Sequence, residues 1–534
     1  TLTTLPFFHA APAWFERLCD GTSTGRIFVG ELALTAWALF APAMLMGLSL
    51  PLLVAGIVRE PGSYGDKLGR LYAVNTLGCA LGAFLTGFVL IPRLGIHATV
   101  GVIPGATLSV GVIAWERAAA LTYRLRVLGN AVVLCAGVVA WLSLPAGPFL
   151  KSSLFAPRKL LFYAEGNNAT VSVLQEGDGT KSISVDGQPV AGTVGTSVID
   201  QKMLAHLPLL LHHAPHRALT VGFGSGGTSY SMSLHGVAVD CVELEACVPA
   251  AAHLFESENH GVFAYPNFRL IVDDARSYLH LAPADYDVIV TDCTNIQYRS
   301  NGDLYTVDYF RLMRDRLTPQ GIAAAWVPAN GIAESDLKIL LRSFRQVFPH
   351  TTIWYMNTLA TDFVIVTGTP TRLEVDLDAL GTRMASSDVA RDLSEVGLSD
   401  PFRLLYTLLV GEDEIEAYLA GGAVNTDDKP VLSYSTYGAS FQSTIAGNLS
   451  KLLAYRKEVS RYASPSGAGS SHLRHFAASN ELILGHIAHL AGADSAALPH
   501  YQRAAQLLPD DLAVQALAQP IYRRGYSTAS ERAD

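Results

Sequence analysis

Charged side chains are scarce in this sequence. Of its 534 residues, 16% are Asp, Glu, Lys or Arg, whereas an ordinary soluble domain carries about 25%. Half of the residues are apolar, so the chain is neither disordered nor fibrous. At about 150 residues per domain, its length predicts three or four folded units. The formal net charge of −9 argues against a broad electrostatic surface for nucleic acid.

Cysteine is also rare. Six cysteines in a chain of this length do not make a disulfide scaffold. No two of them have C-x-x-C spacing, so we expect no structural zinc site. Residues 1–26 lack the charged head and apolar run of a secretory signal. Because the sequence begins with Thr1, we expect either processing or a longer parent protein.

Charge is missing altogether from long segments near the N-terminus. Residues 32–58 contain no charged side chain, and a helix that crosses a bilayer needs about 20 apolar residues. Three further apolar segments follow, at 71–91, 98–115 and 127–146. We therefore predict a transmembrane region of about four helices rather than four buried helices of a soluble core. Lys and Arg are equally numerous on the two sides, so the positive-inside rule gives no orientation.

The pattern changes to alternating strands and helices after residue 151. Period-two alternation at 170–174 and 181–185, with a Gly-Asp-Gly turn between them, predicts a β-hairpin. Short apolar runs alternating with helical segments then predict five parallel strands, at 218–221, 237–242, 268–272, 286–291 and 322–327. A short turn between 352–355 and 362–367 requires these two strands to be antiparallel. Together these features predict an α/β, Rossmann-like, seven-stranded sheet of the type found in S-adenosylmethionine enzymes.

The C-terminal third is less regular. Residues 464–471 have the composition of a linker, and 481–511 predict a helical hairpin with tetratricopeptide-like positions. One such repeat cannot stand alone, so it is either a docked helical pair or a remnant. The predicted organisation is an N-terminal segment, a transmembrane region, a small β-rich subdomain with a helix, the Rossmann-like domain, a mixed extension, and a linker with the helical hairpin, at 1–30, 31–150, 151–215, 216–370, 371–463 and 464–534.

A glycine-rich loop follows the first strand of the predicted sheet. Gly222, Gly224 and Gly227 fit G-x-G-x-x-G, in which glycine permits a tight turn and close approach of a nucleotide. Glu243 ends the next strand, 21 residues after Gly222, where a carboxylate binds ribose hydroxyls. Asp274 ends the third strand. It is either an acceptor for an adenine amino group or the N-cap of the following helix.

The fourth strand ends at a further carboxylate, Asp292. Ligands of such sheets bind outside the carboxyl ends of the strands, which makes Asp292 the candidate catalytic residue. Cys293 lacks an activating histidine nearby in the sequence, so nucleophilic catalysis is not expected. Three histidines, at 212, 213 and 216, predict a solvated turn rather than a metal site, because no carboxylate or cysteine lies among them.

The ordered motifs between residues 163 and 368 resemble the spermidine/spermine synthase (aminopropyltransferase) family. These motifs are VDG at 185–187, DQKMLAHLP at 200–208, the glycine loop, VELE at 242–245, YDVIVTD at 286–292 and LYTVDYF at 304–310. The front of the chain is similar to the membrane-fused bacterial branch of that family, through LGRLYAVNTLG at 68–78. The tail signature NTDDKP at 425–430 is similar to the same branch.

This resemblance implies roles for the site residues. Gln201 and the glycine loop would line a sulfonium nucleoside, Glu243 would hold its ribose, and Asp274 with Ala275 its adenine. Asp292 would orient and deprotonate the attacking amine. The implied co-substrate is decarboxylated S-adenosylmethionine, or S-adenosylmethionine itself. No tightly bound cofactor and no metal are implied.

Three positions depart from the family pattern. Asn295 stands where the family has a second Asp, Ser225 replaces an acid of the glycine loop, and Asp200 replaces the Tyr before Gln201. The nucleoside half of the site is kept, whereas the polyamine half is altered. Asp200, Asn295 and Tyr305 are the weaker candidates for contact with the amine substrate.

Three interpretations of the function stay open at this point. The ordered motifs favour aminopropyl transfer to an amine. Asn295 favours either an S-adenosylmethionine-dependent methyltransferase or a membrane scaffold that binds a nucleoside without turnover. The Asn/Asp-Pro-Pro-aromatic run of amino-group methyltransferases is absent after the fourth strand.

The expected partners are a nucleoside, an amine, the lipid bilayer and a second copy of the chain in a homo-oligomer. The C-terminal helices offer a surface for a protein partner, and no nucleic acid is expected. We expect a multi-pass protein of the bacterial inner membrane. Because sulfonium nucleosides are made in the cytoplasm, residues after Lys151 should face that side.

Overall fold

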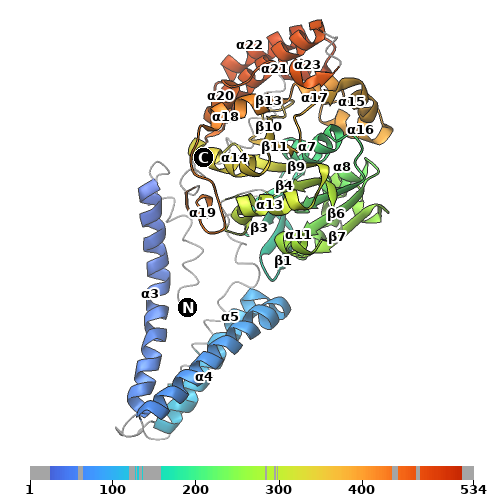
Figure 1. The fold of residues 1–534 in the computed structure, drawn as a ribbon. Helices are drawn as coiled ribbons and strands as arrows, with labels where there is room; N and C mark the ends of the chain where they lie inside the picture. Colours follow the sequence, from blue (N-terminus) through green and yellow to red (C-terminus); the bar gives the residue numbers. More distant parts are fainter. Residues whose placement is uncertain are drawn as a thin grey trace. The chain divides into compact units, whose positions relative to one another are not determined.

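The computed structural model describes residues 24–57, 64–118, 127, 129–131, 135, 158–282, 285–293, 296, 299–435, 443–464 and 469–519. The chain forms two compact units, Thr1–Gly177 and Asp178–Asp534, which are described separately below. Figure 1 shows the ribbon of both.

The first unit contains long apolar helices and one β-hairpin. The helices are α3 (Thr24–Ile57), α4 (Tyr64–Leu85), the π-helical turn η2 (Thr86–Leu90) and α5 (Ile91–Ala118). The hairpin is β1 (Lys159–Glu165) paired antiparallel with β2 (Thr170–Gln175). Apolar side chains on α3 point outward; Phe40 and Met46 are 67% and 76% exposed. Such a surface is unusual for a helix in water.

Three of the four predicted apolar segments are helical in the structure. Most of the fourth, 127–146, lies outside the described residues. In the described part of this unit, one helical stretch, Gly65–Ile96, is long and apolar enough to cross a membrane. One stretch of this kind is weak evidence by itself, so the four-helix transmembrane region stays a prediction.

The second unit is built on a mixed β-sheet whose order is β13-β10-β11-β9-β8-β5-β6-β7. Strands β5 to β9 are parallel, and β10, β11 and β13 add antiparallel pairs. All seven predicted strands are present. The bounds are β5 (Arg217–Val221), β6 (Ala238–Glu243), β7 (Phe268–Val272), β8 (Tyr286–Thr291), β9 (Leu317–Pro328), β10 (His350–Trp354), β11 (Phe363–Thr369) and β13 (Leu408–Val410).

The prediction of a seven-stranded sheet is wrong by one strand, because β13 joins the sheet as an eighth. It comes from the C-terminal extension and pairs with β10, opposite Ile353 and Trp354. A three-residue strand carries too little pattern to be recognised in a sequence. By pairing with β10 it protects an edge that would otherwise be open.

Helices cover both faces of the sheet (Figure 1). Successive residues of a strand point to opposite faces, and accordingly Leu219 and Ala218 belong to two different buried clusters. The first cluster holds the apolar sides of α11 (Ala275–Leu281), α13 (Val307–Asp315) and α14 (Glu334–Val347). The second holds those of α7 (Gly195–Leu211), α8 (Gly227–Ser233), α15 (Leu377–Met384) and α16 (Ser387–Glu395).

The small hairpin before α7 consists of β3 (Lys181–Val185) and β4 (Gln188–Gly192). Asp186 and Gly187 form its turn with φ of 49° and 82°. Two consecutive positive φ values are typical of the tight turns that suit the strand twist. Short helices α9 (Cys247–Ala250), α10 (Glu256–Asn259) and α12 (Arg299–Gly302), with the 3₁₀ turns η3 (Ala252–Phe255), η4 (Val262–Ala264) and η5 (Asp303–Tyr305), connect the sheet strands.

The extension after β11 packs into both buried clusters of the sheet. Its elements are β12 (Val375–Asp376), α15, α16, α17 (Pro401–Leu405), β13, α18 (Glu412–Leu419), α19 (Leu432–Ser435), α20 (Ile445–Leu453), η7 (Ser460–Tyr462) and β14 (Ala463–Ser464). Ile415 and Leu449 lie in the first cluster, and Leu393 in the second. The extension is thus part of the core of the second unit.

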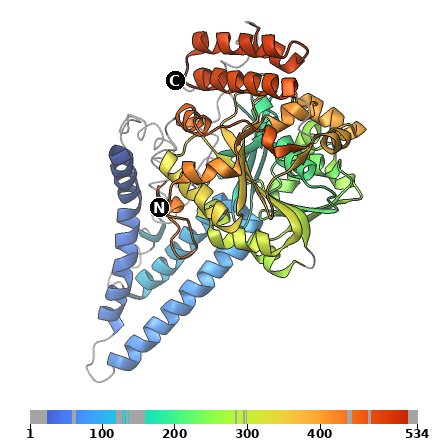
Figure 2. The ribbon, with the colours of Figure 1, turned by 45° about the horizontal axis from the view of Figure 1, so that its top comes forward.

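The predicted C-terminal helical hairpin is present. It consists of α21 (Gly469–Leu490) and α22 (Asp494–Leu507), followed by α23 (Leu512–Leu517), and Figure 2 shows the first two side by side. Any side chain at Gly485 would collide with the ring of Tyr501, so glycine permits the close approach of the two helices. Ala497 and Ala504 are buried in the same interface. The tetratricopeptide-like assignment stays a prediction.

Candidate active site

The glycine loop follows β5 and lies against the end of β8 and against Gln201 within α7. Gly222, Gly224 and Gly226 have φ of 101°, 56° and 91°, a region that side chains disfavour. A Cβ atom at Gly222 would collide with the carbonyl oxygen of Asp292, and one at Gly227 with Oε1 of Gln201. The glycines therefore allow two candidate site residues to approach the loop closely.

Glu243 ends β6 and holds the glycine loop in place. Its Oε2 accepts a hydrogen bond from the Phe223 N–H at 2.9 Å, and its Oε1 accepts one from the Glu245 N–H at 2.9 Å. Burial raises the pKa of this carboxyl, and the backbone N–H groups oppose the rise. A carboxylate has about four acceptor positions, and the backbone N–H groups do not use all of them, so Glu243 can still accept a hydrogen bond from a hydroxyl group of a ligand.

Gln201 lies behind the loop. Its Nε2 donates to the Ser197 carbonyl at 2.8 Å, and the Ser225 hydroxyl donates to its Oε1. Gln201 is 5% exposed. Ser225, which replaces the family's acidic residue, thus ties the loop to α7. These hydrogen bonds hold the glycine loop against α7. Direct contact of Gln201 with a nucleoside stays a prediction.

Asp292 directly follows β8, and its N–H donates to the Val221 carbonyl at 2.9 Å. Its Oδ2 accepts a hydrogen bond from the Thr228 hydroxyl at 2.7 Å. Burial raises the pKa of Asp292 to about 6; the Thr228 hydrogen bond opposes the rise, and the charge of Glu243 adds to it. A base that titrates near neutrality suits proton removal at physiological pH.

Thr228 provides a pH prediction. Replacing it with Val removes the hydroxyl that stabilises the charged form of Asp292, so the pKa of Asp292 should rise further. The activity that depends on ionised Asp292 should then appear at higher pH, with its acid limb moved upward by about one pH unit. The measurement is a profile of kcat/KM against pH. An unchanged acid limb would contradict the role of Thr228.

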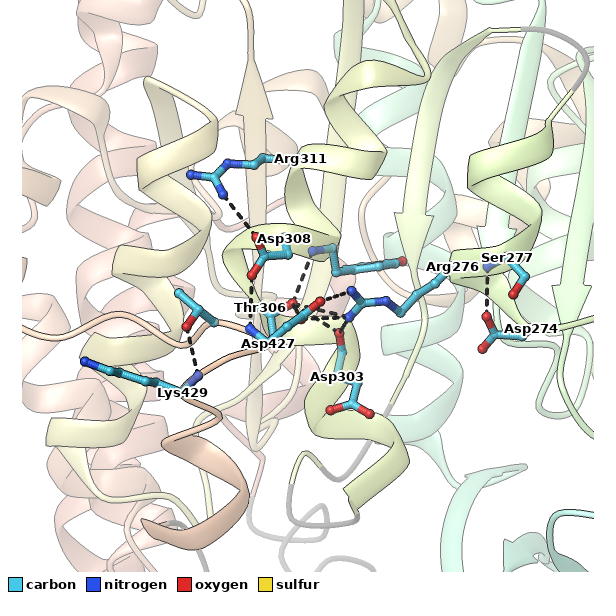
Figure 3. A network of polar contacts seen from close by, with 11 residues as sticks. Asp274, Arg276, Ser277, Asp303, Thr306, Asp308, Arg311, Asp427 and Lys429 are labelled. Atoms are coloured by element: carbon cyan, nitrogen blue, oxygen red, sulfur yellow. Dashed lines mark hydrogen bonds and ion pairs between the residues drawn. The ribbon is translucent and has the colours of Figure 1, made fainter.

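Asp274 is the N-cap of α11. Its Oδ1 accepts a hydrogen bond from the Ser277 N–H at 2.8 Å (Figure 3). The structure thus supports the capping alternative. Because the cap uses only Oδ1, contact with an adenine amino group stays a prediction. Ala275, the first residue of the helix, is buried.

Asp427, in the tail signature 425–430, contacts the same helix, α11. Arg276 donates to Asp427 Oδ1 at 3.0 Å and to the Asp303 carbonyl at 2.8 Å. Thr306 donates to Asp427 Oδ1 at 2.8 Å, and Asp308 accepts from the Asp427 N–H at 3.0 Å (Figure 3). Asp427 therefore joins α11 to the start of α13. The sequence marked Asp427 only as part of a family signature and gave it no role.

The loop after β8 includes the other predicted substrate residues. Tyr305 is fully buried, and its hydroxyl lies 2.6 Å from the Cys293 carbonyl and 2.7 Å from the Trp326 carbonyl. This places Tyr305 between the ends of β8 and β9. Asn295 lies outside the described residues. Burial, and then the charges of Asp292 and Glu243, raise the pKa of the Cys293 thiol, which disfavours the thiolate.

Metal chemistry was not expected from the sequence. Across residues 158–282 and the other ranges that the structure describes, no group of three or more His, Cys, Asp or Glu side chains could hold a metal ion. His212 accepts a hydrogen bond from the Ala214 N–H at 3.2 Å, which is typical of a turn. The side chain of His212 is 7% exposed, so the prediction of a solvated turn is wrong for this residue.

Comparison with known proteins shows which family the second unit is similar to. Residues 197–377 match the family model of the spermine/spermidine synthase domain. This part of the chain is therefore similar to the spermine/spermidine synthase family. The match includes every predicted site residue, from Asp200 to Tyr305, and leaves out the apolar helices and the tail signature.

Two curated proteins and one solved structure are similar to this chain. The chain is 26% identical over 220 residues to a polyamine aminopropyltransferase of Thermotoga maritima, covering 37% of this chain and 74% of that protein. It is 26% identical over 159 residues to a spermidine synthase of Dictyostelium discoideum, covering 29% and 56%. A crystal structure of a probable spermidine synthase from Corynebacterium glutamicum is similar at 17% identity and a TM-score of 0.37, covering 50% and 96%.

Proposed function

We propose that this chain is an aminopropyltransferase. The donor is decarboxylated S-adenosylmethionine, the acceptor is an amine, and the second product is methylthioadenosine. The main support for this proposal is Asp292, a carboxylate with a pKa of about 6 that lies at the end of β8, next to the glycine loop and Glu243. Its place fits a base that acts on an amine beside a bound nucleoside.

The proposed reaction is a single displacement. The lone pair of the neutral amine forms a bond to the aminopropyl carbon next to sulfur, and the carbon–sulfur bond breaks. The electrons of that bond return to sulfur, which turns from a sulfonium cation into a neutral thioether. The proton that the amine loses passes to Asp292. Alignment of the two reactants can supply about 7–11 kcal/mol of the barrier reduction.

Product analysis tests this proposal and separates it from methyl transfer. The purified chain is incubated with an amine mixture and either decarboxylated or ordinary S-adenosylmethionine, and the products are identified by mass spectrometry. We expect methylthioadenosine and an aminopropylated amine from the decarboxylated donor. Methylated products from the ordinary donor would support a methyltransferase instead. Nucleoside binding without any product would support a scaffold.

We further propose that the apolar helices anchor the chain in a bacterial inner membrane and that the synthase domain faces the cytoplasm. The exposed apolar side chains of α3 support this placement. With four spans, the loop 59–70 would then lie outside. In a variant whose exposed Cys79 and Cys135, and also Cys19, are replaced by Ser, a cysteine at Ser63 should react with an impermeant reagent in intact cells. A cysteine at the exposed Glu256 should react only after lysis.

Labelling of Ser63→Cys only after lysis would overturn this orientation, or would show that the number of spans is not four. The two cysteine positions serve as controls for each other, because they lie in different units of the chain.

A further inference from the structure

We propose that Tyr305 and Tyr309 position Asp292 for the reaction, and that the tail signature 425–430 holds these two tyrosines in place. A segment beyond residues 197–377, the part that matches the synthase model, then completes the site. This inference rests on the proposed transfer reaction, in which Asp292 is the base, and it gives the tail signature a positioning role in that reaction.

The residues on both sides of Asp292 each contact one of these tyrosines. The hydroxyl of Tyr309 lies 2.9 Å from the hydroxyl of Thr291, which directly precedes Asp292. The hydroxyl of Tyr305 donates a hydrogen bond at 2.6 Å to the carbonyl of Cys293, which directly follows Asp292. Both tyrosines are fully buried. The segment that carries Asp292 is therefore held before and after the carboxylate.

Tyr305 also joins the ends of two neighbouring strands. Its hydroxyl lies 2.7 Å from the carbonyl of Trp326 on β9, in addition to its contact with Cys293 after β8. A hydroxyl has one proton to donate, and that of Tyr305 is directed at these carbonyls. Tyr305 then acts through Asp292, whereas the sequence predicted a contact with the amine.

Asn425, the first residue of the tail signature, holds the backbone around Tyr305. Its Nδ2 donates to the Tyr305 carbonyl at 3.1 Å, and its carbonyl accepts from the Val307 N–H at 2.9 Å. Its own N–H donates to the Ser343 hydroxyl at 2.8 Å, and its Oδ1 accepts from the Leu432 N–H at 3.2 Å. Asn425 is fully buried. A buried amide whose polar groups all have partners has a fixed orientation, so it fixes the start of α13.

Asp427 holds the next residue along, Thr306. The Thr306 hydroxyl donates to Oδ1 of Asp427 at 2.8 Å (Figure 3). The same hydroxyl caps α13 by accepting the Tyr309 N–H at 3.1 Å. The Asp427 N–H donates to the Asp308 carboxylate at 3.0 Å, and the ion pair with Arg276 holds Asp427 from the side of α11. Asp427 thus supports the turn of α13 that carries Tyr309.

The position of Asp292 matters because a base must lie within hydrogen-bond reach of the proton that it removes. A displacement of about 1 Å, caused by a change distant from the chemistry, can lower a rate by about 100-fold. The contacts from the tail to the two tyrosines, and from these to Thr291 and Cys293, form one continuous path to Asp292. Loss of a link in this path should lower turnover and leave the nucleoside site intact.

The first test measures turnover and nucleoside binding in the full chain. Tyr305→Phe and Asp427→Ala should each lower kcat by about 10-fold. The KM values and the Kd of methylthioadenosine, measured by calorimetry, should stay nearly constant, because Glu243 and the glycine loop are unchanged. Full kcat in both folded variants would overturn the inference and leave the proposed transfer intact.

Two matched variants separate positioning from a loss of stability. Tyr286→Phe removes another fully buried hydroxyl of the same strand, one that donates to Asp240 at 2.7 Å at the start of β8. It should lower Tm and leave kcat unchanged. Asp428→Ala removes the exposed neighbour of Asp427 and should change neither value.

A double variant tests whether Tyr305 acts through Asp292. A positioning residue loses its effect when the group that it places is gone, so the two changes should not be additive. In the Asp292→Asn background, Tyr305→Phe should therefore leave the residual rate nearly unchanged. A further 10-fold loss in that background would show that Tyr305 acts independently of Asp292, and would overturn the inference.

Hydrogen exchange keeps this inference separate from the proposed function, because it needs no substrate. The amide N–H groups at the end of β8 are followed by mass spectrometry of peptides that cover 286–293. They should exchange about 10-fold faster in Tyr305→Phe and Asp427→Ala than in the wild type, and at the wild-type rate in Asp428→Ala. Absence of any product in the wild-type chain would overturn the proposed function. Unchanged exchange in the two variants would overturn the positioning role.

Discussion

Replacing Asp292 with Asn should lower the turnover rate by about 100-fold or more, the usual effect of losing a positioned base. The substitution keeps the shape of the side chain and removes its charge. Nucleoside affinity should change little, because Glu243 and the glycine loop remain. The measurement pairs steady-state kinetics with calorimetric binding of methylthioadenosine. Full activity in this variant would show that Asp292 is not the base.

The same variant should be more stable than the wild type at neutral pH. The folded-state pKa of about 6 exceeds the ordinary value of 3.8. Protonated Asp292 therefore favours the fold at low pH, and this contribution is lost as pH rises from about 4 through 6. At pH 7.5 the charged carboxylate costs about 1–3 kcal/mol. Asn removes that cost, so Tm should rise at pH 7.5 and change little at pH 4. A lower Tm at pH 7.5 would contradict the burial of a charged Asp292.

Replacing Glu243 with Ala should weaken nucleoside binding by about 100-fold. The variant loses the acceptors for ribose hydroxyls and also the two hydrogen bonds that hold the Phe223 and Glu245 N–H groups. Glu243→Gln keeps one acceptor oxygen and should give a smaller loss. Glu256→Gln, at an exposed position on α10, is the control.

Calorimetry with decarboxylated S-adenosylmethionine and methylthioadenosine measures this effect. If Glu243→Ala bound these nucleosides as tightly as the wild type, the pocket would lie elsewhere. Binding of NAD without affinity for the nucleosides would show that the glycine loop belongs to a dinucleotide enzyme.

The sheet was predictable because its strands are continuous apolar runs that end at turns and acids. β7 and β8 begin and end at the predicted residues, 268–272 and 286–291. Buried parallel strands show this pattern because both faces are covered. The ends of these strands also placed Glu243, Asp274 and Asp292 correctly at one edge, since parallel strands share their carboxyl ends.

The contacts between distant segments were not predictable. Thr228 gives no sequence signal for its hydrogen bond to Asp292, because hydroxyl groups are common in helices and the partner is 64 residues away. Trp326 and Asp362 belonged to two predicted strands, 322–327 and 362–367, and gave no further signal in the sequence. α7 packs against β9 and β11, and no local periodicity in the sequence predicts packing between segments so far apart.

The link between Arg276 and Asp427 spans 151 residues of sequence, and the family match ends at residue 377. A ribosome therefore releases every predicted site residue before it releases Asp427 and the edge strand β13. Until then, the start of α13 lacks its hydrogen bond to the tail, and β10 presents an unpaired edge. During synthesis there is therefore an interval in which the predicted site residues have been made but Asp427 and β13, which complete the fold around them, have not. In that interval a chaperone or another nascent chain can reach the open sheet edge.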